Sequence, residues 1–363
     1  MLAFRLFFVP LHPKTISIMT KKTTNKKSSR YVVPVAVCVL AIIGLAYYYL
    51  FSPMSKMDET VYVCIDDDDN ADSVFTKVQV IASKHGIAAF KTMARHTSYL
   101  DNIRTGRYEV TTDDGALSVF RRMKNGMQTP LNLTIPSVRT MDRLAAVLGE
   151  KLMADSAEIA DALTSEEVCR KYGYDTLTIA CMFIPNTYDV YWNTSVDNFL
   201  DRMQKECQAF WNDERKQKAK AMHFTPEEVT TLASIVDEES NDDGEKPMIA
   251  GMYYNRLKQQ MPLQADPTVK FALKDFGAKR IYEKMLRADS PYNTYRNVGL
   301  PPGPIRIPSV AGIEAVLNYA HHDYLYMCAK EDFSGTHNFA RTYAEHLANA
   351  AKYSAALNAR GIK

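Results

Sequence analysis

Three adjacent carboxylates, Asp237, Glu238 and Glu239, are the side chains of this sequence best suited to proton transfer. At about 100° per residue along a helix, Glu239 falls about 20° from Leu232 and so lies on the apolar stripe. Asp237 and Glu238 point further from that stripe. A carboxyl group in an apolar cleft has its pKa raised by desolvation and can stay protonated as a general acid. If the helix frays before Ser240, Glu239 is instead a solvated terminal residue.

The helix that positions these carboxylates is predicted to begin at Thr225. Thr225 is a favourable N-cap, Pro226 suits the first helical position, and Glu228 lies three residues after the cap. The apolar stripe consists of Val229, Leu232, Ala233, Ile235 and Val236. This spacing predicts one buried helix face, and Glu239 lies at its end.

Polar and aromatic residues concentrate in the loops predicted after this helix. Asn255 and Arg256 end a second predicted helix. Turn-rich segments follow at residues 263–268, 290–295 and 299–304. Tyr292 and Asn293 share one of these loops and suit a carbohydrate, because aromatic faces stack on sugar rings and amides bond hydroxyl and acetamido groups. Turn chemistry alone would also account for the Tyr-Asn-Thr sequence.

The N-terminal region has the pattern of a membrane anchor. Residues 1–30 carry seven Lys or Arg residues and no Asp or Glu, and residues 31–51 carry no charge. Val32–Phe51 is an apolar run of 20 residues, about the length that spans a hydrocarbon core. Because basic residues mark the cytoplasmic side, we expect residues 1–30 in the cytoplasm, a single-pass helix over 31–51 and an exported body. A buried helix or a cleaved signal peptide fits this pattern less well.

Composition excludes several other classes of protein. The chain has 363 residues, 46% of them hydrophobic, which is not typical of a disordered chain. Its 44 basic and 42 acidic residues nearly balance and give no indication of nucleic-acid binding. The six Cys residues are scattered, and their spacing indicates neither a disulfide framework nor a zinc site. We therefore expect no metal and no cofactor. Met19, which precedes Thr-Lys-Lys, is a second candidate initiator.

Two exported parts are predicted after the anchor. Residues 52–136 read as a short polar linker, Ser52–Glu59, and a small α+β module. The module includes a predicted helix over 116–124 and a predicted strand over Leu131–Ile135, which alternates with period two. From residue 137 to residue 363 the pattern is largely helical and forms the second, larger part. The expected fold class is α+β throughout.

The larger part resembles the endolytic murein transglycosylases, the YceG-like family. The resemblance rests on segments LASIVDEES (232–240), YNRL (254–257), LQADPTV (263–269), SPYNTY (290–295), GLPPGPI (299–305) and HNFARTYAEH (337–346), and on PNTYDVYW (185–192). It implies a single-pass membrane protein with a LysM-like module before an α+β catalytic domain. Asp237-Glu238 replaces the family's Glu-Lys, and Ala265 replaces its usual Thr, without removing the acid.

The resemblance also implies a mechanism and a set of site residues. Glu239 aligns with the family's catalytic acid, the residue that the helical periodicity also selects. The residues expected to bind substrate or orient Glu239 are Asn255, Arg256, Gln264, Asp266, Tyr292, Asn293, Thr294 and His337. Protonated Glu239 would cleave the bond between N-acetylmuramic acid and N-acetylglucosamine, and then act as base toward the 6-hydroxyl, which closes a 1,6-anhydro ring. A lytic enzyme needs only one carboxylate because its nucleophile is intramolecular.

Two other functions stay open from the sequence. A glycoside hydrolase would use Glu239 as acid and Asp266 as base. A non-catalytic glycan-binding scaffold, tethered to the membrane, would not need Glu239. The partners expected in each case are peptidoglycan glycan strands and the lipid bilayer, with peptidoglycan synthases as further candidates and no nucleic acid. The expected location is the cytoplasmic membrane, with the N-terminus in the cytoplasm and the catalytic domain outside.

Overall fold

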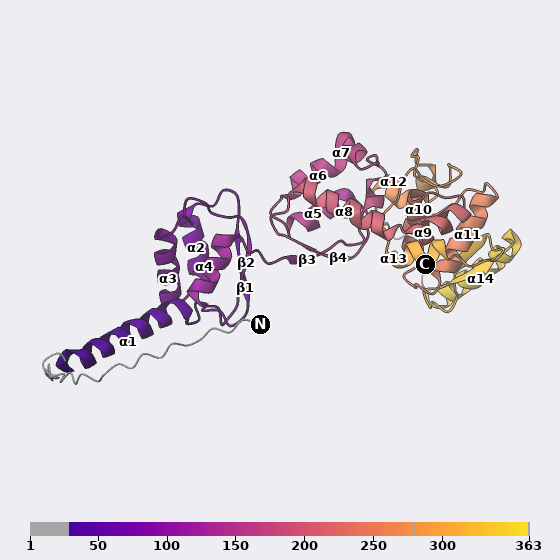
Figure 1. The fold of residues 1–363 in the computed structure, drawn as a ribbon. Helices are drawn as coiled ribbons and strands as arrows, with labels where there is room; N and C mark the ends of the chain where they lie inside the picture. Colours follow the sequence, from indigo (N-terminus) through magenta and orange to yellow (C-terminus); the bar gives the residue numbers. More distant parts are fainter. Residues whose placement is uncertain (1–28, 279, 362–363) are drawn as a thin grey trace, which may run out of the picture.

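The computed structural model describes residues 29–278 and 280–361. A long N-terminal helix, a small module and a larger body follow one another along an extended molecule (Figure 1). The buried apolar side chains form two clusters, the first from Met54 to Met123 and the second from Leu133 to Leu317. The mixed α+β class expected from the sequence is confirmed.

The N-terminal helix α1, Ser29–Phe51, has the dimensions of a membrane span. Its segment Tyr31–Phe51 has a mean hydropathy of 2.2 and is not buried inside the protein. Within the described residues, this is the one helix long and apolar enough to cross a membrane. The basic tail predicted at residues 1–30 lies almost wholly outside the described residues, as does Met19. The helix is therefore compatible with the expected anchor.

The small module consists of a two-stranded antiparallel sheet and three helices. In chain order these are β1 (Val61–Ile65), α2 (Ala71–Ile81), α3 (Lys84–Arg95), β2 (Gly106–Val110) and α4 (Ala116–Asn125). Phe90 lies at the centre of its core, where its ring makes edge contacts with Phe75, Tyr99 and Phe120. The core is closed within the module, because every member of the cluster comes from residues 54–123.

The segment after α1 is built into this module rather than spanning free space. Met54 is fully buried, and its backbone N–H donates to the Asp114 carbonyl at 2.8 Å. The last turns of α1 pack against α3 and α4, and Tyr48 lies 5.3 Å from His85 between ring centroids. The residues expected to form a short polar linker thus hold the helix against the module.

The first half of the larger body combines a second antiparallel strand pair with four helices. Its elements are β3 (Leu131–Thr134), α5 (Met141–Gly149), α6 (Ser156–Thr164), α7 (Glu166–Lys171), β4 (Thr187–Val190) and α8 (Val196–Phe210). The strand expected at Leu131–Ile135 is present, but it pairs with β4 and not within the small module. Leu133 and Ile135 accordingly belong to the second buried cluster. The strand was assigned to the small module because its pairing partner lies more than 50 residues further along the chain. Period-two alternation predicts a strand but does not identify its partner.

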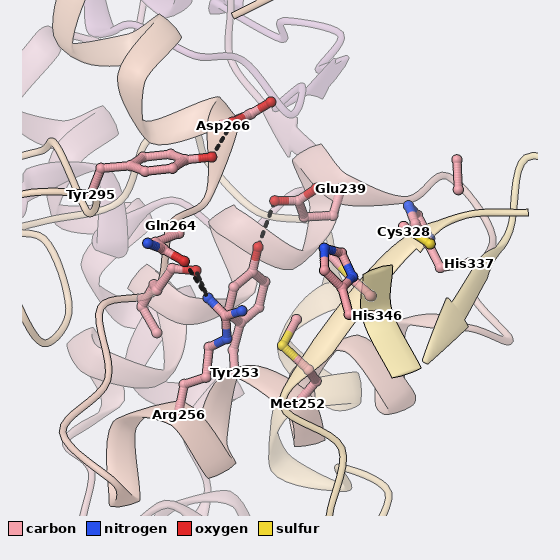
Figure 2. Close-up of a pocket in the computed structure, with 13 residues that line it drawn as sticks. Glu239, Met252, Tyr253, Arg256, Gln264, Asp266, Tyr295, Cys328, His337 and His346 are labelled. Atoms are coloured by element: carbon pink, nitrogen blue, oxygen red, sulfur yellow. Dashed lines mark hydrogen bonds between the residues drawn. The ribbon is translucent and has the colours of Figure 1, made fainter. Parts of the chain in front are cut away.

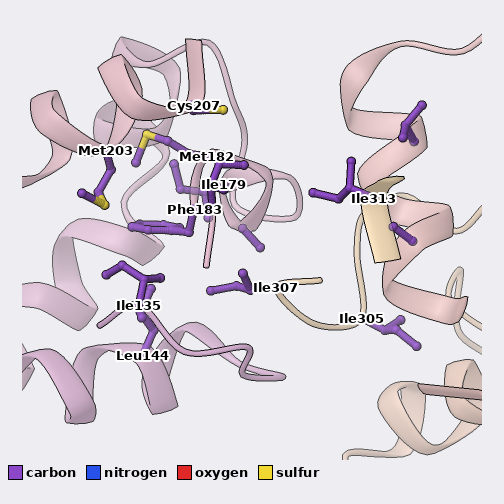
Figure 3. Close-up of a cluster of buried hydrophobic side chains, with 14 of the residues drawn as sticks. Ile135, Leu144, Ile179, Met182, Phe183, Met203, Cys207, Ile305, Ile307 and Ile313 are labelled. Atoms are coloured by element: carbon purple, nitrogen blue, oxygen red, sulfur yellow. The ribbon is translucent and has the colours of Figure 1, made fainter. Parts of the chain in front are cut away.

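The second half of the body carries the elements that surround the candidate site. They are α9 (Asp213–Ala221), α10 (Pro226–Glu239), α11 (Lys246–Lys258), α12 (Asp266–Leu273), α13 (Val310–Leu317), β5 (Tyr326–Ala329), β6 (His337–Ala340) and α14 (Tyr343–Ala359). Helix α10 packs against α11, α12 and α13, and α14 packs against the β5–β6 pair. The two halves share one core (Figure 3), to which Ile305 and Ile307 contribute from the segment that leads into α13.

Candidate active site

Helix α10 has the start that the sequence predicts and delivers three carboxylates at its end. The Thr225 hydroxyl accepts from the Glu228 N–H, and the Glu228 carboxylate accepts from the Thr225 N–H. The helix remains regular through Glu239, and Ser240 is its C-cap. Glu239 therefore does not lie on a frayed end. The three carboxylates nevertheless have three different environments.

Asp237 is a structural residue at the junction of three segments. Its carboxylate accepts from the Ser309 N–H at 2.5 Å and from the Ser309 hydroxyl at 3.0 Å. The Lys246 ammonium lies 2.8 Å away, and both charged side chains are almost fully buried. Asp237 was expected to point away from the interior, which is wrong, because α13 and Lys246 cover this side of α10. Gly312 is required here, since a Cβ at that position would meet the Asp237 carboxylate at 2.5 Å.

Glu238 is neutralised by two arginines. Arg139 donates to it from Nε and Nη2, each at 2.8 Å, and Arg306 donates from Nη1 at 3.0 Å. Bidentate contact of this kind is a strong, charge-assisted interaction. Glu238 therefore ties the end of α10 to the segments around residues 139 and 306.

Glu239 faces a cavity of about 290 Å³ (Figure 2). Its Oε1 accepts a hydrogen bond of 2.6 Å from the Tyr253 hydroxyl of α11, and no Lys or Arg forms an ion pair with it among the described residues. Burial raises the pKa of Glu239 to about 7, and the negative charge of Asp266 adds to the rise, while the Tyr253 hydrogen bond and His337 oppose it. Glu239 can thus hold a proton near neutral pH.

The opposite wall of the cavity comes from the start of α12 and the loop before it. The Tyr295 hydroxyl donates to Asp266 Oδ1 at 2.6 Å, which fixes this carboxylate beside the cavity. Gln264 lines the same wall in a left-handed backbone conformation, with φ of 52°. Such a conformation costs a non-glycine residue about 1 kcal/mol or more and is common at ligand sites. The Gln264 N–H donates to the Thr294 carbonyl at 3.1 Å, which helps to hold the turn.

Arg256 and Asn255 support the cavity from behind. The Arg256 guanidinium is buried and lines the cavity, where it donates to the carbonyls of Leu263 at 2.8 Å and Leu325 at 2.6 Å. Asn255 donates to the carbonyls of His322 at 2.6 Å and Tyr324 at 3.1 Å. Each side chain therefore satisfies backbone carbonyls of a surrounding loop. Arg256 contributes to the cavity wall, and Asn255 does not reach it.

Tyr292, Asn293 and Thr294 lie inside the fold and do not line the cavity. Asn293 donates to the carbonyls of Leu286 at 2.9 Å and Ala288 at 2.8 Å. The Thr294 hydroxyl accepts from the Ala265 N–H at 3.0 Å. The three residues therefore shape the loop that carries Tyr295. All three were expected to bind substrate. In the structure they are buried, and Asn293 and Thr294 bond backbone groups of the surrounding loops.

His337, on β6, closes the cavity on the side opposite to α12. The Nδ1 atom of the His337 ring lies 3.0 Å from Glu245 Oε2. The backbone N–H of His337 donates to Glu245 Oε1 at 2.6 Å. Cys328 of β5 and His346 of α14 line the same side. These contacts tie β6 to the start of α11 and keep the His337 ring beside Glu239.

The structure thus brings together five of the nine predicted site residues. The cavity is lined by Glu239, Arg256, Gln264, Asp266 and His337, but not by Asn255, Tyr292, Asn293 or Thr294. The cavity is also lined by Tyr253, Tyr295 and His346, which were not among the predicted site residues. Tyr295 and His346 end two of the motifs used above, and Tyr253 directly precedes a third, but the sequence does not show which neighbouring side chain faces the cavity.

This arrangement can perform acid–base chemistry with one protonatable carboxyl group. Among residues 29–278 and 280–361, no group of three or more His, Cys, Asp or Glu side chains has the geometry to hold a metal ion. The cavity walls are mainly polar, with two carboxylates, a buried guanidinium, an amide and tyrosine hydroxyls. Such walls suit a hydroxyl-rich ligand.

Comparison with known proteins identifies the family. The model of the YceG-like family matches residues 63–352. The chain is 28% identical to the endolytic murein transglycosylase of Bacillus subtilis, over 87% of this chain and 92% of that protein. It is 27% identical to the Streptococcus pneumoniae protein of the same name, over 85% of this chain but only 61% of that longer protein.

A solved structure agrees with this assignment. The crystal structure of a YceG-like protein from Listeria monocytogenes matches with a TM-score of 0.53 at 25% sequence identity, over 80% of this chain and 99% of that one. The family match covers both the small module and the larger body. This chain belongs to the YceG-like family.

Proposed function

We propose that this protein is an endolytic lytic transglycosylase, a lyase that cleaves the glycan strands of peptidoglycan. The names of its relatives and its membership of the YceG-like family support the reaction class. The observation that carries the proposal for this chain is Glu239, a carboxyl group in a polar cavity with a pKa raised to about 7 and no paired cation among the described residues. At neutral pH such a group exists in both protonation states, which general acid–base catalysis requires.

In the proposed reaction, protonated Glu239 donates its proton to the oxygen that joins N-acetylmuramic acid to N-acetylglucosamine. The bond from this oxygen to the anomeric carbon breaks, and the leaving sugar departs with a hydroxyl group. Glu239, now ionised, accepts the proton of the muramic 6-hydroxyl as that oxygen bonds to the anomeric carbon. The ring closes as a 1,6-anhydro sugar, and Glu239 regains its proton without consuming water.

The surrounding residues have two proposed roles. Tyr253 orients Glu239 and stabilises its ionised form between the two steps, since its hydroxyl donates to Oε1. Asp266, Gln264 and His337, which face the same cavity, bind the saccharide. Arg256 shapes the wall behind them. Asn255, Tyr292, Asn293 and Thr294 act indirectly, because they hold the loops that present the lining residues.

We further propose that α1 anchors the enzyme in the cytoplasmic membrane, with the module and body exported. Residues 31–51 would span the bilayer, and the basic tail would stay in the cytoplasm. The small module, with its own core, would act as a LysM-like glycan-binding module. Because α1 packs directly on this module, the body would meet strands close to the membrane, where synthases extend them, and cleavage there would terminate elongation.

Mass analysis of products tests this function. Purified glycan strands are digested with the full-length protein in detergent, and the masses of the products are measured by mass spectrometry. Lytic cleavage predicts anhydro ends, which lack one water relative to reducing ends. Reducing ends would instead indicate a hydrolase in which Asp266 activates water. Strands that bind but stay intact would indicate a scaffold.

A further inference from the structure

A second cavity, of about 390 Å³, is lined by three arginines and no carboxylate. Its lining side chains are Ser137, Val138, Arg139, Thr140, Arg143, Phe276 and Arg306. It lies between the start of α5 and the segment that precedes α13, which the hydrogen bond from the Ile307 N–H to the Val138 carbonyl holds together at 2.8 Å. We call it the arginine cavity.

The charge of the arginine cavity is only partly balanced by the protein. Glu238 neutralises one of the two positive charges of Arg139 and Arg306, which both contact it. Arg143 forms no ion pair or side-chain hydrogen bond within the described part of the chain, and it is exposed at the cavity. Three guanidinium groups and one carboxylate leave a net charge of +2. Guanidinium groups bind carboxylates and phosphates in a planar, bidentate manner, so the cavity is suited to an anion.

The position of the arginine cavity relates it to the candidate active site. Glu238, which the two arginines hold, directly precedes Glu239 on α10. A narrow adjoining cavity is lined by Arg139, Glu238, Pro267 and Lys270. Pro267 follows Asp266, which lines the catalytic cavity. The end of α10 and the start of α12 therefore lie between the two cavities.

The lining also indicates what kind of anion fits. Phe276 forms an aromatic wall, with the Arg139 guanidinium 5.4 Å from its ring centroid. The hydroxyl groups of Ser137 and Thr140 supply polar contacts, although both already have partners in the protein. A ligand that carries both carboxylates and small apolar groups matches this mixture better than a bare inorganic ion. A short acidic peptide has this chemistry.

We propose that the arginine cavity binds the carboxylates of the peptide stem that N-acetylmuramic acid carries in peptidoglycan. This inference rests on the proposed function, since it takes the glycan strand as the substrate. Arg143 is a specificity residue in this proposal. It contacts the peptide and lowers KM for strands that carry stems, while the chemical step at Glu239 is unaffected.

Kinetics on two matched substrates test the proposal. Full-length enzyme is assayed on strands with intact stem peptides and on strands from which an amidase has removed them. We expect a lower KM for stem-bearing strands. Arg143→Glu should raise that KM by about tenfold, the effect of losing one charge-assisted contact, and leave stripped strands unaffected. Lys220→Glu, an exposed change of equal charge on α9 outside the cavity, should alter neither KM.

Four results would overturn the proposal. One is equal KM values of the wild-type enzyme for both substrates, and another is an equal effect of Arg143→Glu on both. Direct binding of the free stem peptide to full-length protein provides a readout that does not require cleavage, and equal binding by the wild type and Arg143→Glu is the third. Failure to cleave either substrate would refute the proposed function instead, with peptide binding still deciding the role of the cavity. Inorganic phosphate should compete with the peptide only weakly, and stronger binding of phosphate than of peptide would likewise contradict it.

Discussion

Removal of the Tyr253 hydroxyl should shift the pH dependence of catalysis. The 2.6 Å hydrogen bond from the Tyr253 hydroxyl favours the ionised form of Glu239, and Tyr253→Phe removes this bond. A hydrogen bond to a charged group contributes about 1.5–3 kcal/mol, and one pKa unit corresponds to about 1.4 kcal/mol. The pKa of Glu239 should therefore rise by roughly one to two units above its value of about 7 in the wild type.

The assay is the pH profile of kcat/KM on purified glycan strands. Because the free enzyme must hold a proton on Glu239, activity falls as pH rises through the pKa of this group. The alkaline limb of Tyr253→Phe should lie about one to two pH units above that of the wild type, with a lower maximum because the ionised intermediate state is less stable. Tyr254→Phe is the matched control, since its hydroxyl donates to the Met222 carbonyl at 3.3 Å and not to Glu239.

An unchanged alkaline limb in an active Tyr253→Phe enzyme would refute this reasoning. It would mean that the hydrogen bond does not influence the proton on the catalytic group. An equal shift in Tyr254→Phe would show that the effect comes from a general change in α11 rather than from the contact with Glu239.

Three further predictions concern stability and topology. Because the pKa of Glu239 is raised on folding, its protonation stabilises the folded state. This contribution to the free energy of unfolding is complete below about pH 4.5 and is lost as pH rises through about 7. Glu239→Gln should therefore unfold like the wild type at pH 4 and be about 3 kcal/mol more stable at pH 8, as measured by denaturant titration; equal stability at pH 8 would contradict the burial of this group. Asn293→Ala should cost about 2 kcal/mol, because two buried carbonyls lose their donor, while KM stays unchanged; a raised KM with normal stability would show direct substrate binding. Protease added outside intact spheroplasts should digest residues 52–363, and full protection would overturn the proposed topology.

Local sequence patterns predicted the helix that carries the site but only part of its environment. The Thr225 cap and the apolar stripe are properties of neighbouring residues, so the start of α10 and the direction of Glu239 followed from them. The burial of Asp237 depends on Lys246 and Ser309, which other segments bring to it. Helical periodicity contains no information about such partners.

For the loop residues, too, the sequence predicted the composition of the loop but not which side chains face the cavity. Tyr292, Asn293 and Thr294 have the composition of a sugar-binding loop, yet buried backbone groups nearby need hydrogen-bond partners, and Asn293 and Thr294 supply them. Tyr295, one residue later, faces the cavity and holds Asp266. Which residue of such a run faces the ligand depends on the path of the loop, and this is set by contacts distant in the sequence.

In the proposed mechanism, Glu239 alone donates and accepts the proton. Cleavage of purified glycan strands by Glu239→Gln and Glu238→Gln, compared with the wild type, tests this role. Gln preserves the shape of each side chain but cannot donate the proton, so Glu239→Gln should release no products while keeping a normal melting profile. Glu238→Gln should retain most activity, because Glu238 is held by Arg139 and Arg306 away from the chemistry. Wild-type turnover by Glu239→Gln, or an equal loss of activity in Glu238→Gln, would contradict this role of Glu239.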